Sequence, residues 1–125
     1  MKKITYQNIS EHLVREIPEF KDRVSQHIKE QCGTVLPHVL FEDLARFVVE
    51  VYRNNPESKK TKDILLRNAK FIEDLLDTGD VMIVNLVGVS FLEYNFESNK
   101  QYSAGIRKYF FPKTIALLDR IEGKA

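Results

Sequence analysis

Residues 79–98 read GDVMIVNLVGVSFLEYNFES, and the interpretation of this stretch decides the fold. Large apolar side chains dominate it, its acids lie only near its two ends, and it contains no Lys or Arg. The uncharged run from Val81 to Leu92 is well short of the roughly 20 apolar residues that a membrane-spanning helix needs. We therefore expect no membrane segment here, but a segment that belongs to the core of a folded domain.

The same stretch has features of a strand and of a helix. Its many β-branched residues favour a strand. The run has no alternation with a period of two, however, and it is long for a strand. No other segment has the pattern of a partner strand, so the backbone groups of a lone strand would stay unpaired. We therefore predict a helix from Val81 to Phe96, enclosed by other helices, with the acids at its ends displayed.

The composition is that of an ordinary folded protein. The chain has 125 residues, of which 43% are hydrophobic and 30% charged. Its single cysteine, Cys32, excludes an intrachain disulfide and suits a reducing compartment. Acids and His12 interrupt what would be the apolar core of a secretion signal near the N-terminus. These features predict a single helical domain, residues 1–125, in the cytoplasm.

Proline and glycine residues divide the chain into helical segments. Pro18 suits the first turn of a helix, where its missing N–H costs no bond. Gly33 and Gly79 suit left-handed caps at helix ends, and Asp80 suits an N-cap. The expected helices cover 4–17, 18–33, 37–54, 58–78, 81–96 and 103–122, the last one kinked or split at Pro112.

About six helices joined by short loops predict an all-α fold of three helical hairpins. Apolar residues recur at helical spacing in each segment, which supports this assignment. The hairpins can form an irregular bundle around the helix at 81–96, or a short stack of the HEAT or armadillo kind. No repeat of fixed period is visible, so the sequence leaves both arrangements open.

Charge is segregated along the chain, although the net charge is only +1. The segment 71–99 has no Lys or Arg, and the flanking segments 59–70 and 100–113 are basic. The acids of the segment 71–99 are Glu73, Asp74, Asp77, Asp80, Glu93 and Glu97. Two uses are open: these carboxylates pair with the neighbouring basic segments, or they form a docking surface for a basic partner.

The strongest catalytic candidate lies in LPHVLFEDLARFVVE, residues 36–50. His38, Glu42 and Arg46 follow one another at intervals of four on one predicted helix. His38 and Glu42 can share a proton or bind a metal. A metal needs three or four ligands, however, and the sequence has no HExxH motif or Cys cluster. A solvated polar stripe with Glu42 and Arg46 paired explains the same spacing. We therefore expect no catalytic residue, no metal and no cofactor.

Two basic stretches raise the question of nucleic-acid binding. They are SKKTK at 58–62 and IRKYFFPK at 106–113, the second with interleaved aromatic residues. We expect these aromatic side chains to lie in the core, and the neighbouring acidic segment repels phosphate. The sequence therefore predicts no nucleic acid as a partner.

Two further stretches resemble a known group of proteins. They are LPHVLFEDLARFVVEVYR at 36–53 and LVGVSFLEYN at 86–95. Over residues 10–97 the chain resembles small bacterial all-helical proteins without known catalytic function. Some of these are similar to immunity proteins from contact-dependent growth inhibition and related polymorphic toxin systems. The resemblance implies a protein that binds a cognate toxin, the C-terminal domain of a large secreted protein, in the producing cell and blocks its active site.

Many such toxins are nucleases, so the resemblance implies an RNase or another nuclease with a basic cleft as the target. The acidic segment is then the contact surface, with carboxylates standing where substrate phosphates would lie. Aromatic and Arg side chains anchor such interfaces. The predicted partner-binding residues are Glu73, Asp74, Asp77, Asp80, Glu93, Tyr94, Glu97, Tyr102, Arg107 and Tyr109.

An immunity protein of this kind is expected to be a monomer or a weak homodimer and not an enzyme. Two alternatives stay open. One is a helical scaffold or regulatory module that forms a homodimer, in which oppositely charged segments meet across a twofold axis. The other is a small hydrolase that uses His38 and Glu42.

Overall fold

The computed structural model describes residues 3–93 and 100–123, and every element within these ranges is helical. The elements are α1 (Ile9–Glu16), η1 (Pro18–Phe20), α2 (Lys21–Glu30), α3 (Pro37–Asn54), α4 (Lys59–Asp77), α5 (Val81–Leu86), η2 (Val87–Glu93), α7 (Lys100–Arg107) and α8 (Pro112–Ile121). The prediction of an all-α fold is confirmed. None of the helices in these ranges is long and apolar enough to cross a membrane.

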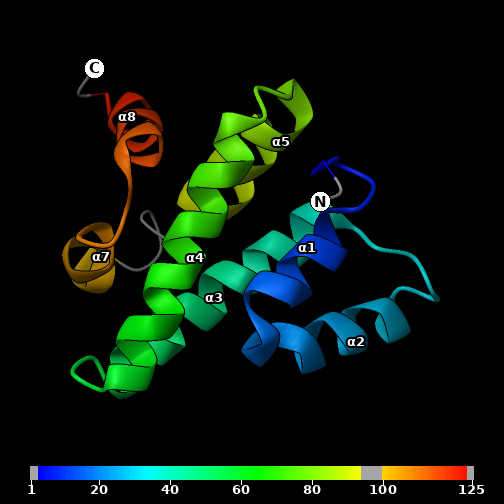
Figure 1. The fold of residues 1–125 in the computed structure, drawn as a ribbon, viewed down its shortest axis with the longest axis horizontal. Coiled ribbons are helices and arrows are strands. Elements are labelled where there is room, and N and C mark those ends of the chain that lie inside the picture. Colours follow the sequence, from blue (N-terminus) through cyan, green and yellow to red (C-terminus); the bar gives the residue numbers. More distant parts are fainter. Residues whose placement is uncertain (1–2, 94–99, 124–125) are drawn as a thin grey trace.

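The two longest helices, α3 and α4, form the middle of the structure, with α1 and α2 on one side and α7 and α8 on the other (Figure 1). α3 contacts α2, α4, α5, η2 and α7, while α4 contacts α1, α3, α5, η2 and α8. In a HEAT-type stack each repeat contacts only its neighbours. Here one hairpin contacts nearly every other described element, so the arrangement is an irregular bundle around α3 and α4.

The boundaries of α3 and α4 follow from local chemistry. Pro37 stands in the first turn of α3, and the helix ends shortly before Pro56, as expected. Ser58 caps α4, since its hydroxyl accepts a hydrogen bond from Thr61 N at 3.4 Å. The buried residues of α3 recur at intervals of three and four, which is typical of a helix covered along one face. They are Leu40, Phe41, Leu44, Ala45, Val48 and Val49.

The first helix is shorter than the predicted 4–17. Thr5 N donates to Asn8 Oδ1 at 2.7 Å, and Asn8 N donates to Thr5 Oγ1 at 3.2 Å. These local bonds hold the backbone in a turn, so α1 begins only at Ile9. The second helix also ends early, at Glu30, because the backbone turns left-handed before and at Gly33, where φ is +88°.

The segment from Val81 to Glu93 is helical, as predicted, but it is not enclosed. α5 continues directly into η2, which has π-helical hydrogen bonding. Of the described elements, α3, α4 and α8 pack against this segment and leave one face open. Val81 is 81% exposed, Met82 53% and Val89 46%. The prediction of a sequestered helix therefore holds for the inner face, where Ile83, Leu86 and Phe91 are buried, and is wrong for the outer face. The rest of that predicted helix, 94–96, lies outside the described residues.

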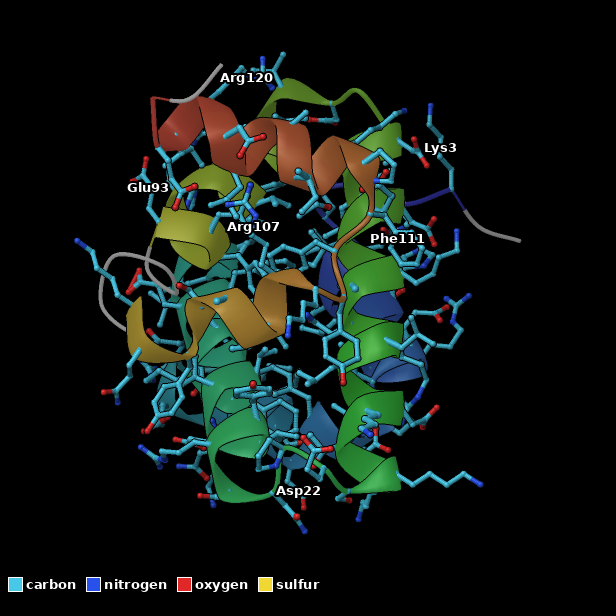
Figure 2. The ribbon with its side chains drawn as sticks, turned by 90° about the vertical axis from the view of Figure 1, so that its left-hand side faces the viewer. Lys3, Asp22, Glu93, Arg107, Phe111 and Arg120 are labelled. Carbon is cyan, nitrogen blue, oxygen red and sulfur yellow. The ribbon has the colours of Figure 1, made fainter. Side chains whose placement is uncertain are left out.

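α7 packs against α3, and α8 lies across α4 and η2 (Figure 2). They are separate helices because Pro112 begins α8, which confirms the predicted split. α7 approaches α3 closely at Gly105. A Cβ atom on this residue would lie 1.9 Å from the hydroxyl oxygen of Tyr52 and 2.4 Å from its Cζ. Only glycine therefore allows the observed contact between these two helices.

An ion-pair network ties η1 to α4. Arg67 donates two parallel hydrogen bonds to the Glu19 carboxylate, at 2.9 and 2.6 Å. It also donates to Asp63 Oδ2 and to the backbone carbonyl of Glu16. The hydrogen bonds from Arg67 lower the pKa of Glu19 below its ordinary value. Bidentate pairs of this kind are stronger than most surface ion pairs.

We expect Gly105→Ala to lower the free energy of unfolding by about 1–3 kcal/mol, because overpacking against Tyr52 outweighs the gain in helix propensity. Gly88→Ala is the matched control, since a Cβ there would meet only ordinary contacts at 3.8 Å. Urea unfolding of the two variants measures the difference. Equal stabilities would contradict the close approach of α7 to α3.

We expect Glu19→Gln to reduce stability at neutral pH, with a difference from wild type that disappears at acidic pH. A carboxylate with a lowered folded-state pKa stabilises the fold above its unfolded pKa of roughly 4.3. That contribution is lost as pH falls through the lower folded-state value. Glu11→Gln is the control, since the Glu11 side chain is exposed on α1. A pH-independent difference for Glu19→Gln would contradict the role of the Arg67 pair.

Candidate functional site

An open groove runs between the α5–η2 segment and α8. It has a volume of about 410 Å³. Its lining residues are Gly79, Val81, Val84, Asn85, Gly88, Val89, Glu93, Leu117 and Ile121. Most of this lining is apolar, and Val81 and Val89 are also among the most exposed large apolar residues of the described chain. A concave apolar surface that stays open to solvent is typical of a binding site.

The sequence builds the groove through a regular spacing. Val81, Asn85, Val89 and Glu93 follow one another at intervals of four, so they lie along one face of the α5–η2 segment. Gly88 has no side chain, and a Cβ there would lie 3.8 Å from atoms of the α8 side chains. Gly88 is buried, so α8 packs closely against the segment at this point and forms the second wall.

The opposite face of the segment is joined to α3 by a polar contact. His38 Nδ1 and Ser90 Oγ share a hydrogen bond at 2.6 Å, and Ser90 is only 2% exposed. No hydrogen bond joins His38 to Glu42, both of which the structure describes; Arg46 pairs with Asp43 instead. A serine buried in this way joins two helices and is not accessible to a substrate.

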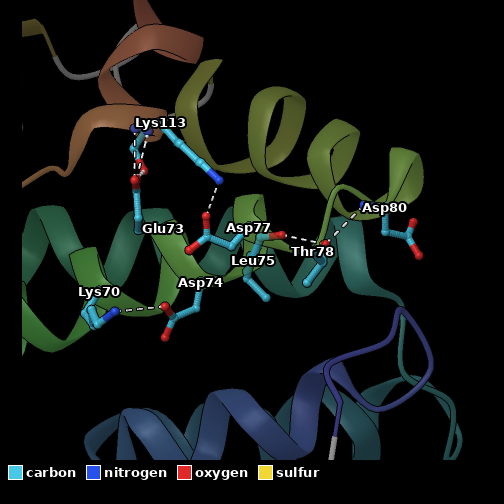
Figure 3. Close-up of polar contacts among 9 residues, drawn as sticks. Lys70, Glu73, Asp74, Leu75, Asp77, Thr78, Asp80 and Lys113 are labelled. Atoms are coloured by element: carbon cyan, nitrogen blue, oxygen red, sulfur yellow. Dashed lines mark hydrogen bonds and ion pairs between the residues drawn. The ribbon is translucent and has the colours of Figure 1, made fainter.

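α8 is held in place by Glu73 of α4 (Figure 3). Glu73 Oε2 accepts a hydrogen bond from Lys113 N at 2.9 Å. Its Oε1 accepts bonds from Thr114 N at 3.0 Å and from Thr114 Oγ1 at 2.9 Å. The first N–H groups of a helix have no partner within it, and the helix dipole favours a negative charge there. A carboxylate of one helix therefore caps another, and this cap positions one wall of the groove.

Two further carboxylates of α4 pair with lysines (Figure 3). Asp77 pairs with Lys113 of α8, and Asp74 accepts a hydrogen bond from Lys70 Nζ at 3.0 Å. These hydrogen bonds raise the pKa of both lysines above the ordinary value. Asp77 lies near the C-terminus of α4, where the dipole disfavours it. The charge of Lys113 offsets this unfavourable position. Internal pairing, one of the two uses expected of the acidic segment, is thus present.

The remaining described acids stand at the two ends of the α5–η2 segment. Asp80 caps α5 as predicted, because its Oδ1 accepts bonds from Met82 N at 2.8 Å and from Ile83 N at 3.3 Å. Glu93 is exposed at the end of η2 and is the only ionisable residue among those that line the groove (Figure 2). The groove lining is therefore apolar apart from Asn85 in its middle and Glu93 at one end, and Asp80 is exposed beside the other end without lining the groove.

The other predicted contact residues lie elsewhere. Tyr102 packs against Tyr52 of α3, with 6.4 Å between the ring centroids, and Tyr109 is partly buried against the core. Arg107 pairs with Asp119 of α8 and with Glu122 just after this helix, and these hydrogen bonds raise the pKa of Arg107 (Figure 2). Tyr94 and Glu97 lie outside the described residues. Partner binding by any of these residues stays a prediction.

The apolar residues that line the groove are not predicted from the sequence. Val81, Met82 and Val89 are expected there in a buried core, and nothing singles out Leu117. The spacing carried a signal, since Asn85 and Glu93 share a helix face with Val81 and Val89. Polar residues among apolar ones along one face indicate contact with water. Within the described residues, no cluster of three or more His, Cys, Asp or Glu could hold a metal.

We expect Glu73→Ala to lower the free energy of unfolding by about 1–2 kcal/mol, since α8 loses its N-terminal cap. Hydrogen exchange at the amides of Lys113 and Thr114 should speed up more than exchange elsewhere in α8. Asp74→Ala is the matched control, because it removes only an exposed pair within α4. Unchanged exchange at these two amides would contradict the capping role of Glu73.

Comparison with known proteins assigns a family without an activity. The family model described as a domain of unknown function, DUF7674, matches residues 10–123, which is most of the chain. No curated protein and no solved structure matches. The resemblance to small all-helical proteins is thus confirmed only as membership of a domain family of unknown function. The chain belongs to the DUF7674 family.

Proposed function

We propose that this domain is a non-catalytic binding protein that captures a basic toxin domain and neutralises it, in the manner of an immunity protein. The observation that carries the proposal is the groove between the α5–η2 segment and α8. Specific protein interfaces have an apolar centre and a polar rim, and this groove has both. Val81 and Val89 expose apolar surface to water, and burying this surface against another protein is energetically favourable.

Glu93 at one end of the groove and the exposed Asp80 beside the other end favour a basic partner. Asp80 uses Oδ1 for the cap of α5, and Glu93 is exposed, so both carboxylates can attract cations. Complementary charge speeds the encounter of two proteins and sets their register. A nuclease toxin has a basic, phosphate-binding cleft, so its charge matches this surface. An RNase domain is the target that the resemblance implies, with capture in the cytoplasm of the producing cell.

The proposed contact differs from the one expected from the acids of α4. Glu73, Asp74 and Asp77 already have internal partners, two of them across the α4–α8 contact. A toxin that used these carboxylates would first have to break those pairs, and Glu73 would lose a structural role. The groove needs no such rearrangement, because Val81, Val89 and Glu93 are already exposed.

The test first asks whether the neighbouring gene encodes a large secreted protein with a toxic C-terminal domain, as the proposal expects, and then combines that domain with the full chain. We expect a one-to-one complex and loss of nuclease activity at equimolar protein. Val89→Lys should weaken the complex about tenfold or more, because it places a charge in the apolar centre of the interface. Leu66→Lys is the matched control, since Leu66 is 50% exposed on α4 and does not line the groove.

Calorimetry measures the affinity, and survival of cells that express the toxin domain measures protection. Absence of both binding and protection would overturn the proposed function. A complex that Val89→Lys and Leu66→Lys weaken equally would leave the function in place but would remove the groove as the contact.

A further inference from the structure

We infer that the groove accepts one amphipathic helix of the partner, apolar at its centre and carrying Lys or Arg at both ends. This inference rests on the proposed function and names the element of the partner that is recognised. Three observations support it: the shape of the groove, the backbone chemistry of its walls, and the positions of Glu93 in the groove and Asp80 beside it.

The groove is elongated. Its lining follows the α5–η2 segment from Gly79 at one end to Glu93 at the other. At about 1.5 Å per residue this corresponds to a length of at most about 20 Å, or four turns of an α-helix. Leu117 and Ile121 of α8 form the facing wall. An apolar trough between two helices is the surface into which an amphipathic helix packs, with anchors at intervals of three and four residues.

The backbone chemistry of the walls favours a helical ligand over an extended one. The backbone groups of α5, η2 and α8 are bonded within these helices, so the groove offers side chains and not a free sheet edge. An extended peptide in an apolar trough would leave its own N–H and C=O groups unpaired. A helix pairs these groups internally, so it can lie in the trough without leaving them unsatisfied.

The two acids select the ends of the ligand. Asp80 stands just before the first turn of α5 and Glu93 at the end of η2. The basic residues of α8 that lie closest in sequence to the groove wall, Lys113 and Arg120, line a different pocket between α8 and α4. Lys113 is also paired with Asp77. A ligand with a cation at each end therefore meets Glu93 within the groove at one end and the exposed Asp80 beside the groove at the other.

A second copy of this chain fits the same face poorly. In a twofold dimer through this face, antiparallel α5–η2 segments bring Asp80 of one copy to Glu93 of the other. Parallel segments bring each acid to its own equivalent. Both arrangements place like charges together, which disfavours the pair. The charge pattern therefore favours a basic-ended helix over self-association.

The probe is a synthetic peptide of about 18 residues, with Leu at helical spacing on one face, Ala and Gln elsewhere, and two Lys at each end. One comparison peptide carries Glu in place of the terminal Lys residues. Another has the same composition with the order permuted, so that the Leu residues no longer share a face. Fluorescence anisotropy measures binding, and circular dichroism reports helix formation.

We expect the Lys-ended peptide to bind about tenfold or more tightly than either comparison peptide and to become helical on binding. Asp80→Asn combined with Glu93→Gln should remove most of the preference for Lys ends, because Asn keeps the N-cap while the charge is lost. Val89→Lys should weaken binding about tenfold or more, and Leu66→Lys should not. Val81→Lys replaces Val89→Lys if the latter does not fold, since Val81 is 81% exposed.

Equal binding of Lys-ended and Glu-ended peptides, or binding that Val89→Lys does not change, would overturn the inference. If the peptide fails to bind while the toxin domain is still captured and neutralised, the inference falls and the proposed function stands. Sedimentation tests for the alternative occupant of the groove, a second copy of this chain. A wild-type dimer that Val89→Lys converts to a monomer would identify a second copy of the chain and would also overturn the inference.

Discussion

The structure depends on how the apolar segment from Val81 to Glu93 divides its surface. Its inner face packs against α3, α4 and α8, where Phe91 and Leu92 are fully buried. The hydrogen bond between His38 and Ser90 fixes this face to α3. The segment carries more apolar side chains than its neighbours cover, so its outer face stays in water. That uncovered face has no structural use in the described chain, and it forms the floor of the groove.

The acidic residues of α4 first serve the architecture. Glu73 caps the N-terminus of α8, and Asp77 pairs with Lys113 in the first turn of α8. These contacts span about 40 residues of sequence and set the position of the second groove wall. Arg107 adds a tether between α7 and α8. Among the described acids of the segment 71–99, Asp80 and Glu93 are exposed at the ends of the α5–η2 segment, whereas Glu73 and Asp77 position α8.

Much of the fold could be predicted from the sequence because its boundaries are local. Pro37, Pro112 and Asp80 act on the backbone within one turn, so they mark helix ends without reference to the rest of the chain. The open face of the 81–93 helix could not be predicted in this way, since exposure depends on which elements pack against it. The role of Glu73 was hidden for the same reason: its partners lie in a helix that follows much later. The close contact of Gly105 with Tyr52 is also tertiary.

Of the candidate site, the sequence predicts Asp80 and Glu93 but not the apolar residues between them, because β-branched apolar residues favour burial and the only sign of exposure is that Asn85 and Glu93 share their helix face. The central claim is that this apolar face is where the partner binds. Methyl NMR of protein labelled at Val, Leu and Met, titrated with the toxin domain, tests it most directly. The predicted result is that the methyl signals of Val81, Met82 and Val89 shift while those of exposed Leu36 and Val39 on the α2–α3 side do not. Shifts confined to Leu36 and Val39, with the groove methyls unchanged, would contradict it.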